Sequence, residues 1–134
     1  MTRRLSALVV LAACLLMACA PVPPLPDGYT RQQQVIDGVE ITLDSLKDPQ
    51  VNQTQPFRIS LRDRDGRLID EATVTLDLEM NMICLSGAKP IATRIGRGQY
   101  EALSVYQMPG DWHVTVISEI AATEYRATFV INVN

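Results

Sequence analysis

The chain has 134 residues, 47% of them hydrophobic and 20% charged, which suits one globular domain with a buried core. Twelve basic and fifteen acidic residues give a net charge of −3 without a basic cluster, so the composition argues against nucleic acid as a partner. The sequence has one histidine and no nucleophile elbow, phosphate loop or zinc-ligand spacing, so it also argues against an enzyme.

The first twenty residues have the layout of an export signal. Two arginines precede an apolar run at residues 5–17, and a proline-rich stretch follows in place of a basic stop-transfer flank. The ending Leu16-Met17-Ala18-Cys19 resembles a bacterial lipoprotein signal, in which the cysteine becomes the mature N-terminus and carries lipid. The alternatives are an ordinary signal cut after Ala18 or Ala20, and an uncleaved anchor. The apolar run is short for a membrane span, which needs about 20 residues.

This resemblance implies a signal peptide at residues 1–18 and a lipidated, palmitate-bearing Cys19 in the bacterial cell envelope. Each buried methylene contributes about 0.8 kcal/mol, so several acyl chains hold a protein firmly at a membrane. Residue 20 is Ala and not Asp. This resembles lipoproteins that are exported to the periplasmic face of the outer membrane in preference to the inner one. Signal cleavage removes Cys14 and acylation consumes Cys19, so only Cys84 remains and no internal disulfide is expected.

Residues 19–34 are expected to form a linker, and residues 35–134 the folded domain. Four prolines within six positions favour an extended polyproline conformation, which rises about 3.1 Å per residue. The following run from Arg31 to Gln34 is polar and turn-like. The linker therefore predicts a tether between the lipid and the domain.

From Val35 onward, apolar and polar residues alternate, which is the period of a β-strand with one buried face. The expected strands lie at 39–43, 57–61, 74–78, 91–95, 100–106, 112–116 and 125–133. Turn-forming residues separate them, and Gly66 and Gly98 suit positions of positive φ. About seven regularly spaced strands predict an all-β, immunoglobulin-like antiparallel β-sandwich.

Several short segments of the domain follow one another in a characteristic order. They are Phe57-Arg58-Ile59, Asp65-Gly66, Ala72-Thr73-Val74, Met80-Asn81-Met82, Gly98-Gln99-Tyr100 and Met108-Pro109-Gly110-Asp111-Trp112. Over roughly residues 39–133 this order resembles the YtkA-like domain family, which is similar to FixH proteins. The resemblance implies an immunoglobulin-like, membrane-tethered extracytoplasmic module linked to copper handling or cytochrome oxidase assembly. The family often carries a histidine near the methionine segment, whereas Ile83 and Cys84 follow Met82 here.

Three sulfur-bearing residues at a spacing of two share one face of a predicted strand: Met80, Met82 and Cys84. They are core residues at the end of the sandwich, or they are soft ligands of a Cu(I) site. Met108 is a further candidate ligand, because strand ends meet at common poles of a sandwich. His113 alternates with Trp112 and is expected on the outer face, so it would have to turn inward to bind copper beside Met108.

Taken together, these patterns predict a non-catalytic, lipid-anchored accessory module of the cell envelope. Copper handling or oxidase assembly is the expected role, with Cu(I) as the candidate cofactor. The membrane and an envelope protein are the expected partners. The alternative is a structural or protein-interaction lipoprotein that binds no metal.

Overall fold

Two antiparallel sheets pack face to face to form the domain. The computed structural model describes residues 21–81 and 88–134, and all its regular elements in these ranges are strands. They are β1 (Tyr29–Ile36), β2 (Val39–Leu46), β3 (Thr54–Arg62), β4 (Thr73–Met80), β5 (Thr93–Gly96), β6 (Gln99–Val105), β7 (Gly110–Ile120) and β8 (Thr123–Val133). The predicted all-β antiparallel sandwich is confirmed, with eight strands in place of about seven.

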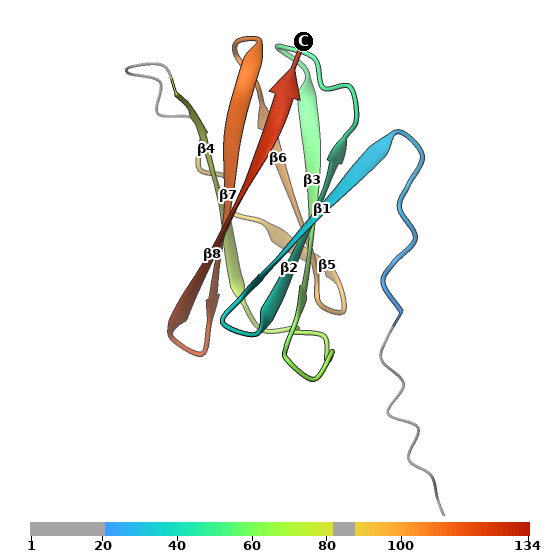
Figure 1. Ribbon diagram of the computed structural model, residues 1–134, viewed down its shortest axis with the longest axis vertical. Helices are drawn as coiled ribbons and strands as arrows, with labels where there is room; N and C mark the ends of the chain where they lie inside the picture. Colours follow the sequence, from blue (N-terminus) through green and yellow to red (C-terminus); the bar gives the residue numbers. More distant parts are fainter. Residues whose placement is uncertain (1–20, 82–87) are drawn as a thin grey trace, which may run out of the picture.

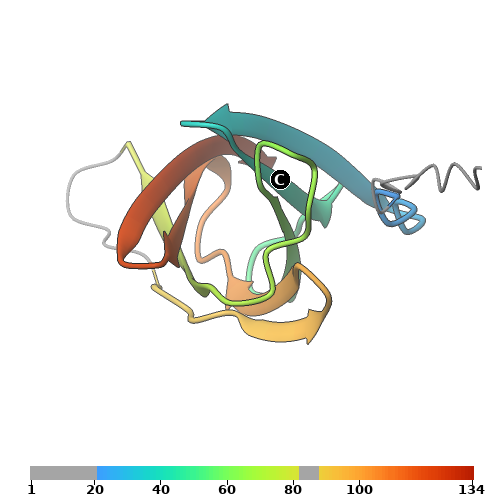
Figure 2. The ribbon, with the colours of Figure 1, turned by 90° about the horizontal axis from the view of Figure 1, so that it is seen from below.

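The strands are divided unequally between the two sheets. The five-stranded sheet has the order β1-β2-β3-β6-β5, and the three-stranded sheet has the order β4-β7-β8 (Figure 1). Seen from below, the two layers face each other (Figure 2), and the buried side chains of the core lie between them. The chain therefore passes from one layer to the other after β3, between β4 and β5, and after β6.

Strict alternation of side chains builds the core. In β4, Val74, Leu76 and Leu78 point inward and are buried, while the polar residues between them point outward. The same pattern in β2, β3, β7 and β8 places aliphatic side chains of both sheets against one another. Each fully buried aliphatic side chain contributes about 1.5–3 kcal/mol, so the core fixes which face of every strand is hidden.

The first strand corrects the predicted boundary between linker and domain. Residues 29–34 were expected to belong to the linker, but β1 pairs with β2 from Tyr29, opposite Leu46, to the end of the strand. The side-chain amides of its inward residues Gln32 and Gln34 donate hydrogen bonds of 3.2 and 2.6 Å to carbonyl oxygens of β8. Because glutamine occupies the inward positions, the segment lacks the apolar alternation that identifies a strand.

The opposite side of the sandwich is closed by the chain between β4 and β5. A strand was expected at residues 91–95, whereas pairing with β6 begins only at Thr93. The preceding residues bond to the edge of β4: Leu76 N donates to Pro90 O at 2.9 Å, and Ala92 N donates to Val74 O at 2.8 Å. The segment thus leaves one sheet and joins the other, which supplies partners for both edges.

The predicted glycine turns are confirmed at Gly66 and Gly98, which have φ of 76° and 60°. At Gly98, an added Cβ would also lie 2.9 Å from Leu68 Cβ, so the turn needs a glycine for space as well as for conformation. The Gly98 amide donates a 2.7 Å hydrogen bond to Asp70, which lowers the pKa of that carboxyl below its ordinary value.

We expect the double substitution Gln32→Ala and Gln34→Ala to lower the free energy of unfolding by about 1–2 kcal/mol, because two carbonyl groups of β8 lose their donors. Urea denaturation followed by circular dichroism measures the loss. Gln33→Ala is the control: this residue is exposed and faces the other way, so its removal should change stability by less than about 0.5 kcal/mol. Equal losses of stability in the two variants would contradict a stabilising role for the hydrogen bonds from Gln32 and Gln34 to β8.

Candidate functional site

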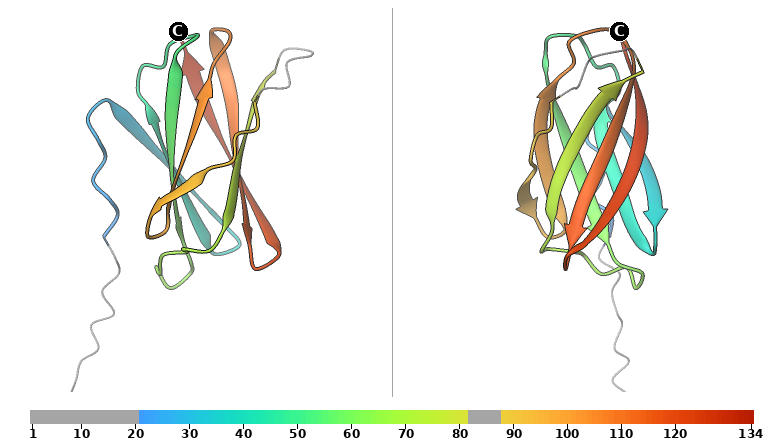
Figure 3. Two further views of the ribbon diagram at one scale, coloured as in Figure 1. Left: turned by 180° about the vertical axis from the view of Figure 1, so that it is seen from behind. Right: turned by 90° about the vertical axis from the view of Figure 1, so that its left-hand side faces the viewer.

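The candidate site lies at the pole of the sandwich where β4 ends and β7 begins (Figure 3). Met80, the last residue of β4, lies directly across from Trp112 of β7. The Trp112 indole is buried between the sheets, and its Nε1–H donates a 3.0 Å hydrogen bond to the carbonyl oxygen of Met108. Trp112 therefore lies across from Met80 in the pairing of β4 with β7, and it is hydrogen-bonded to the backbone of Met108. We call this region the methionine pole, defined by Met80, Met108, Gly110 and Trp112.

An aromatic cluster supports the methionine pole from inside. The centre of the Tyr106 ring lies 5.3 Å from the centre of the Trp112 ring and 6.0 Å from that of the Phe57 ring. Tyr106 and Phe57 are arranged edge to face. Such pairs contribute about 0.5–1.5 kcal/mol beyond the area that they bury. Burial raises the pKa of the Tyr106 hydroxyl far above its ordinary value, so this group stays protonated. The cluster acts as a rigid apolar support.

Gly110 brings Met80 against the loop that carries Met108. Its φ of 126° lies where side chains are strained, and a Cβ at this position would lie 2.9 Å from the Met80 Cε methyl. The terminal methyl group of Met80 thus occupies the space that any other residue at 110 would need. The Met80 thioether is held beside the start of β7 because this position has no side chain.

The structure separates the predicted ligands. Met80 and Met108 both belong to the methionine pole. His113 lies on the outer face of β7, across from Glu79, while the neighbouring Trp112 points inward. The expected outer position of His113 is confirmed, and it directs the imidazole away from the face that carries Met80. Met82 and Cys84, like the predicted lipidation residue Cys19, lie outside the described residues.

The donors at the pole fit a soft metal better than a hard one. Within residues 21–81 and 88–134, no three or more histidine, cysteine, aspartate or glutamate side chains are grouped as metal ligands. Thioether sulfur is a soft, neutral donor that suits Cu(I), and the same side chain also fills irregular gaps in a core. Met80 is partly buried and packs against the core cluster, so its contacts agree with either role.

Comparison with known proteins identifies the family. The sequence model of the YtkA-like family matches residues 33–117. The chain belongs to the YtkA-like family. The match runs from within β1 into β7, and so contains all four residues of the methionine pole. No curated protein matches the chain.

Sequence reasoning identified the methionines of this YtkA-like domain but missed what holds them. From the sequence, Gly110 is recognised only as part of the segment from Met108 to Trp112, and its contact with Met80 depends on the register of β4 against β7. Tyr106 was predicted only as part of a strand. The spacing from Met108 through Gly110 to Trp112 is the one sequence signal that could have predicted this contact, because a glycine close to a buried indole indicates close packing.

We expect Gly110→Ala to lower the free energy of unfolding by about 1–3 kcal/mol, because it strains the backbone and displaces the Met80 methyl group. Gly28→Ala is the matched control: its φ is 80°, but an added Cβ there meets no atom within 4 Å, so only backbone strain remains. Thermal unfolding followed by Trp112 fluorescence measures both. A loss at Gly110 no larger than that at Gly28 would contradict the close contact with Met80.

Proposed function

We propose that this YtkA-like protein is a non-catalytic, lipid-anchored accessory module of the cell envelope that takes part in copper handling or oxidase assembly. The observation that carries the proposal is that the buried Trp112 lies across from Met80 and is hydrogen-bonded to the backbone of Met108, so one pole carries both methionine residues. Soft sulfur donors on a rigid scaffold suit the capture and release of Cu(I). The mechanism is presentation of the metal, or of the pole itself, to a membrane complex.

Met80 and Met108 are the described residues that would hold the metal. Bound Cu(I) would supply ligand-exchange chemistry, in which a soft donor of a partner replaces one of the protein's own. Met82 and Cys84 follow Met80 closely in the sequence and remain proposed further ligands. His113 faces the other side of β7 and is not part of the proposed pole.

The proposed anchor rests on the sequence of the first twenty residues. The sequence Leu16-Met17-Ala18-Cys19 ends an apolar run and is followed by prolines, as in lipoprotein signals. No helix capable of crossing a bilayer occurs in the described ranges. Acyl chains on Cys19 would attach the sandwich to the membrane, with the outer membrane favoured over the inner one by Ala20.

A protein-interaction module without metal is the second candidate. It is favoured by an open groove of about 470 Å³ at the edge of the five-stranded sheet, lined in part by Ile91, Ile95 and Leu103. These three side chains are 71%, 49% and 57% exposed, which is unusual for a group of large apolar residues. In this reading Met80 and Met108 only complete the core.

We expect the reduced mature protein to compete for Cu(I) with a chromophoric chelator, and Met80→Ala with Met108→Ala to weaken its affinity by at least about tenfold. Changes that only disturb ligand orientation already cost about 10–100-fold, so the loss of ligands should cost no less. The titration is followed by the absorbance of the chelator complex.

His113→Ala is the matched control for the copper titration, because this residue faces away from the pole and its removal should leave the affinity unchanged. Adding Met82→Ala and Cys84→Ser to the double variant measures the share of the segment that follows β4. Absence of competition by the unsubstituted protein would favour the metal-free interaction module.

For the anchor, we expect mass spectrometry of the native protein to find an acylated Cys19 as the first residue. Metabolic labelling with an alkyne-bearing palmitate analogue should label the protein, and Cys19→Ser should abolish the label because the acceptor sulfur is gone. Cys84→Ser, which leaves the acceptor in place, should retain it. An unmodified N-terminus or a retained arginine-bearing leader would contradict lipidation.

A further inference from the structure

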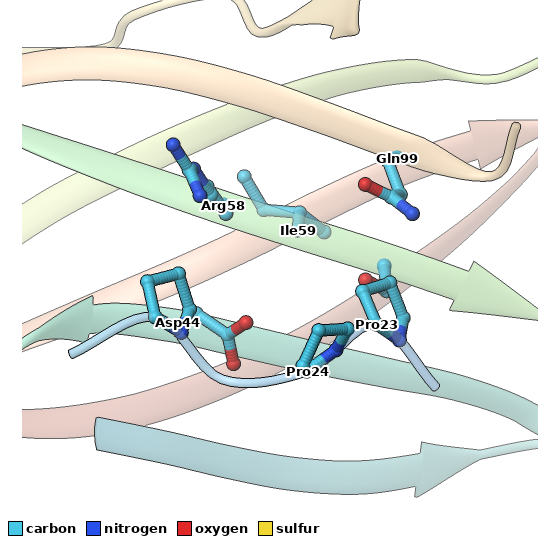
Figure 4. A pocket seen from close by; sticks show the side chains of 8 residues that line it. Pro23, Pro24, Asp44, Arg58, Ile59 and Gln99 are labelled. Carbon is cyan, nitrogen blue, oxygen red and sulfur yellow. The ribbon is translucent and has the colours of Figure 1, made fainter. Parts of the chain in front are cut away.

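The proline-rich segment packs on the domain instead of standing clear of it. Residues 21–28, called the strap below, run from β1 back along the outer side of the five-stranded sheet (Figures 1 and 2). Backbone hydrogen bonds hold its C-terminal end, from Tyr29 N to Pro26 O at 3.2 Å and from Lys47 N to Gly28 O at 2.8 Å. Pro23 and Pro24 border a small cleft of about 40 Å³ beside Asp44, Arg58 and Gln99 (Figure 4).

The strap has two distinct sides. Pro23 and Pro26 are half-buried against the sheet, whereas Val22 and Leu25 are 43% and 41% exposed. Both pairs are separated by three residues, which is one turn of a polyproline II helix. The strap therefore turns two of its four prolines toward the protein, while its two large aliphatic side chains and the other two prolines are exposed.

The sheet beneath the strap carries charges that neutralise one another. Arg31, Asp44, Arg58 and Glu101 lie in one row across β1, β2, β3 and β6, with alternating sign. Arg31 binds both carboxylate oxygens of Asp44 at 2.7 Å, and Arg58 binds Glu101 at 3.1 Å. Arg58 also lies 5.5 Å from the centre of the Tyr29 ring, where the strap joins β1.

The exposed apolar side chains gather on this same side of the molecule. Among the described residues, six of the eight large exposed ones belong to the strap or to the five-stranded sheet: Val22, Leu25, Val35, Ile95, Leu103 and Val105. Of the other two, Val130 lies on the three-stranded sheet, and Ile91 is bridged to Thr75 at the edge of that sheet. A one-sided distribution of this kind marks a contact surface.

The acidic excess of the protein lies on the other side. The outward positions of the three-stranded sheet carry five carboxylates and one arginine: Asp77, Glu79, Asp111, Glu119, Glu124 and Arg126. The outward positions of the five-stranded sheet carry equal numbers of both signs: Arg31, Arg58, Arg62, Glu40, Asp44 and Glu101. Lys89 offsets one of the five carboxylates by binding Asp77 at 3.0 Å, and the strap adds the exposed Asp27 to the other face. The three-stranded side still has the larger acidic excess, so an anionic lipid surface would repel it more strongly.

We propose that the strap and the outer face of the five-stranded sheet lie against the lipid surface, so that the sandwich rests flat on the membrane instead of hanging from a tether. The proposal builds on the proposed lipid anchor. Cys19 precedes the first described residue, Pro21, by two residues, which span at most about 7 Å. The acyl chains would thus enter the bilayer beside the aliphatic side of the strap, and the acidic three-stranded sheet would face away.

The test uses the mature acylated protein in vesicles of phosphatidylethanolamine and phosphatidylglycerol, with no other protein present. An environment-sensitive fluorophore is attached at Leu103→Cys or at Val130→Cys, both in a Cys84→Ser background. The two positions are matched, since their side chains are 57% and 53% exposed and lie on opposite sheets. Co-flotation with the vesicles first establishes attachment.

We expect severalfold stronger quenching by a lipid-borne quencher at position 103 than at position 130. Val22→Asp with Leu25→Asp should reduce quenching at 103 to the level at 130 while flotation persists. Flotation with equal quenching at both positions would overturn the flat orientation alone and leave the face to an envelope protein. Failure to float would overturn the anchor and the orientation together. Circular dichroism confirms that each variant is folded.

Discussion

Every β-sheet ends in backbone groups that need partners, and this constraint explains how the sandwich is closed. On one side, the amides of Gln32 and Gln34 donate to carbonyl groups of β8. On the other side, the chain around Pro90 bonds to β4 before it joins β6 as β5. Because both sides are closed by the chain itself, the two sheets keep one relative position. The register that places Met80 across from Trp112 is set within the three-stranded sheet, by the pairing of β4 with β7.

The residues of the methionine pole pack the end of the sandwich, and its two methionines are also the proposed metal ligands. The Met80 methyl group lies over Gly110, and the Trp112 indole binds the Met108 backbone, so the loop and the strand end are held together without any ligand. If Cu(I) binds at this pole as proposed, a backbone that is already held in place loses little conformational entropy on binding. The same arrangement completes the core of a protein that binds no metal, and chelator competition separates these two functions.

The two outer faces differ in a way that the average composition conceals. The net charge of −3 suggests a mildly acidic surface, yet the carboxylate excess lies on the three-stranded sheet, while the five-stranded sheet carries balanced charges and most exposed aliphatic side chains. The strap joins the second face through its half-buried prolines. A protein with such faces has a preferred orientation at a charged surface.

The amino-acid sequence alone determined the fold class, the glycine turns, the outward position of His113 and the resemblance to the YtkA-like family, because these follow from local alternation, turn chemistry and short motifs. The sequence also indicated the methionines as candidate ligands. The tertiary structure alone decided that the chain from Tyr29 to Gln34 is a strand and that the strap packs on the sheet. It also decided that Gly110 makes room for Met80. Each of these depends on a partner far away in the chain, such as β8 for the glutamines and β4 for Gly110, and local patterns carry no record of such pairs.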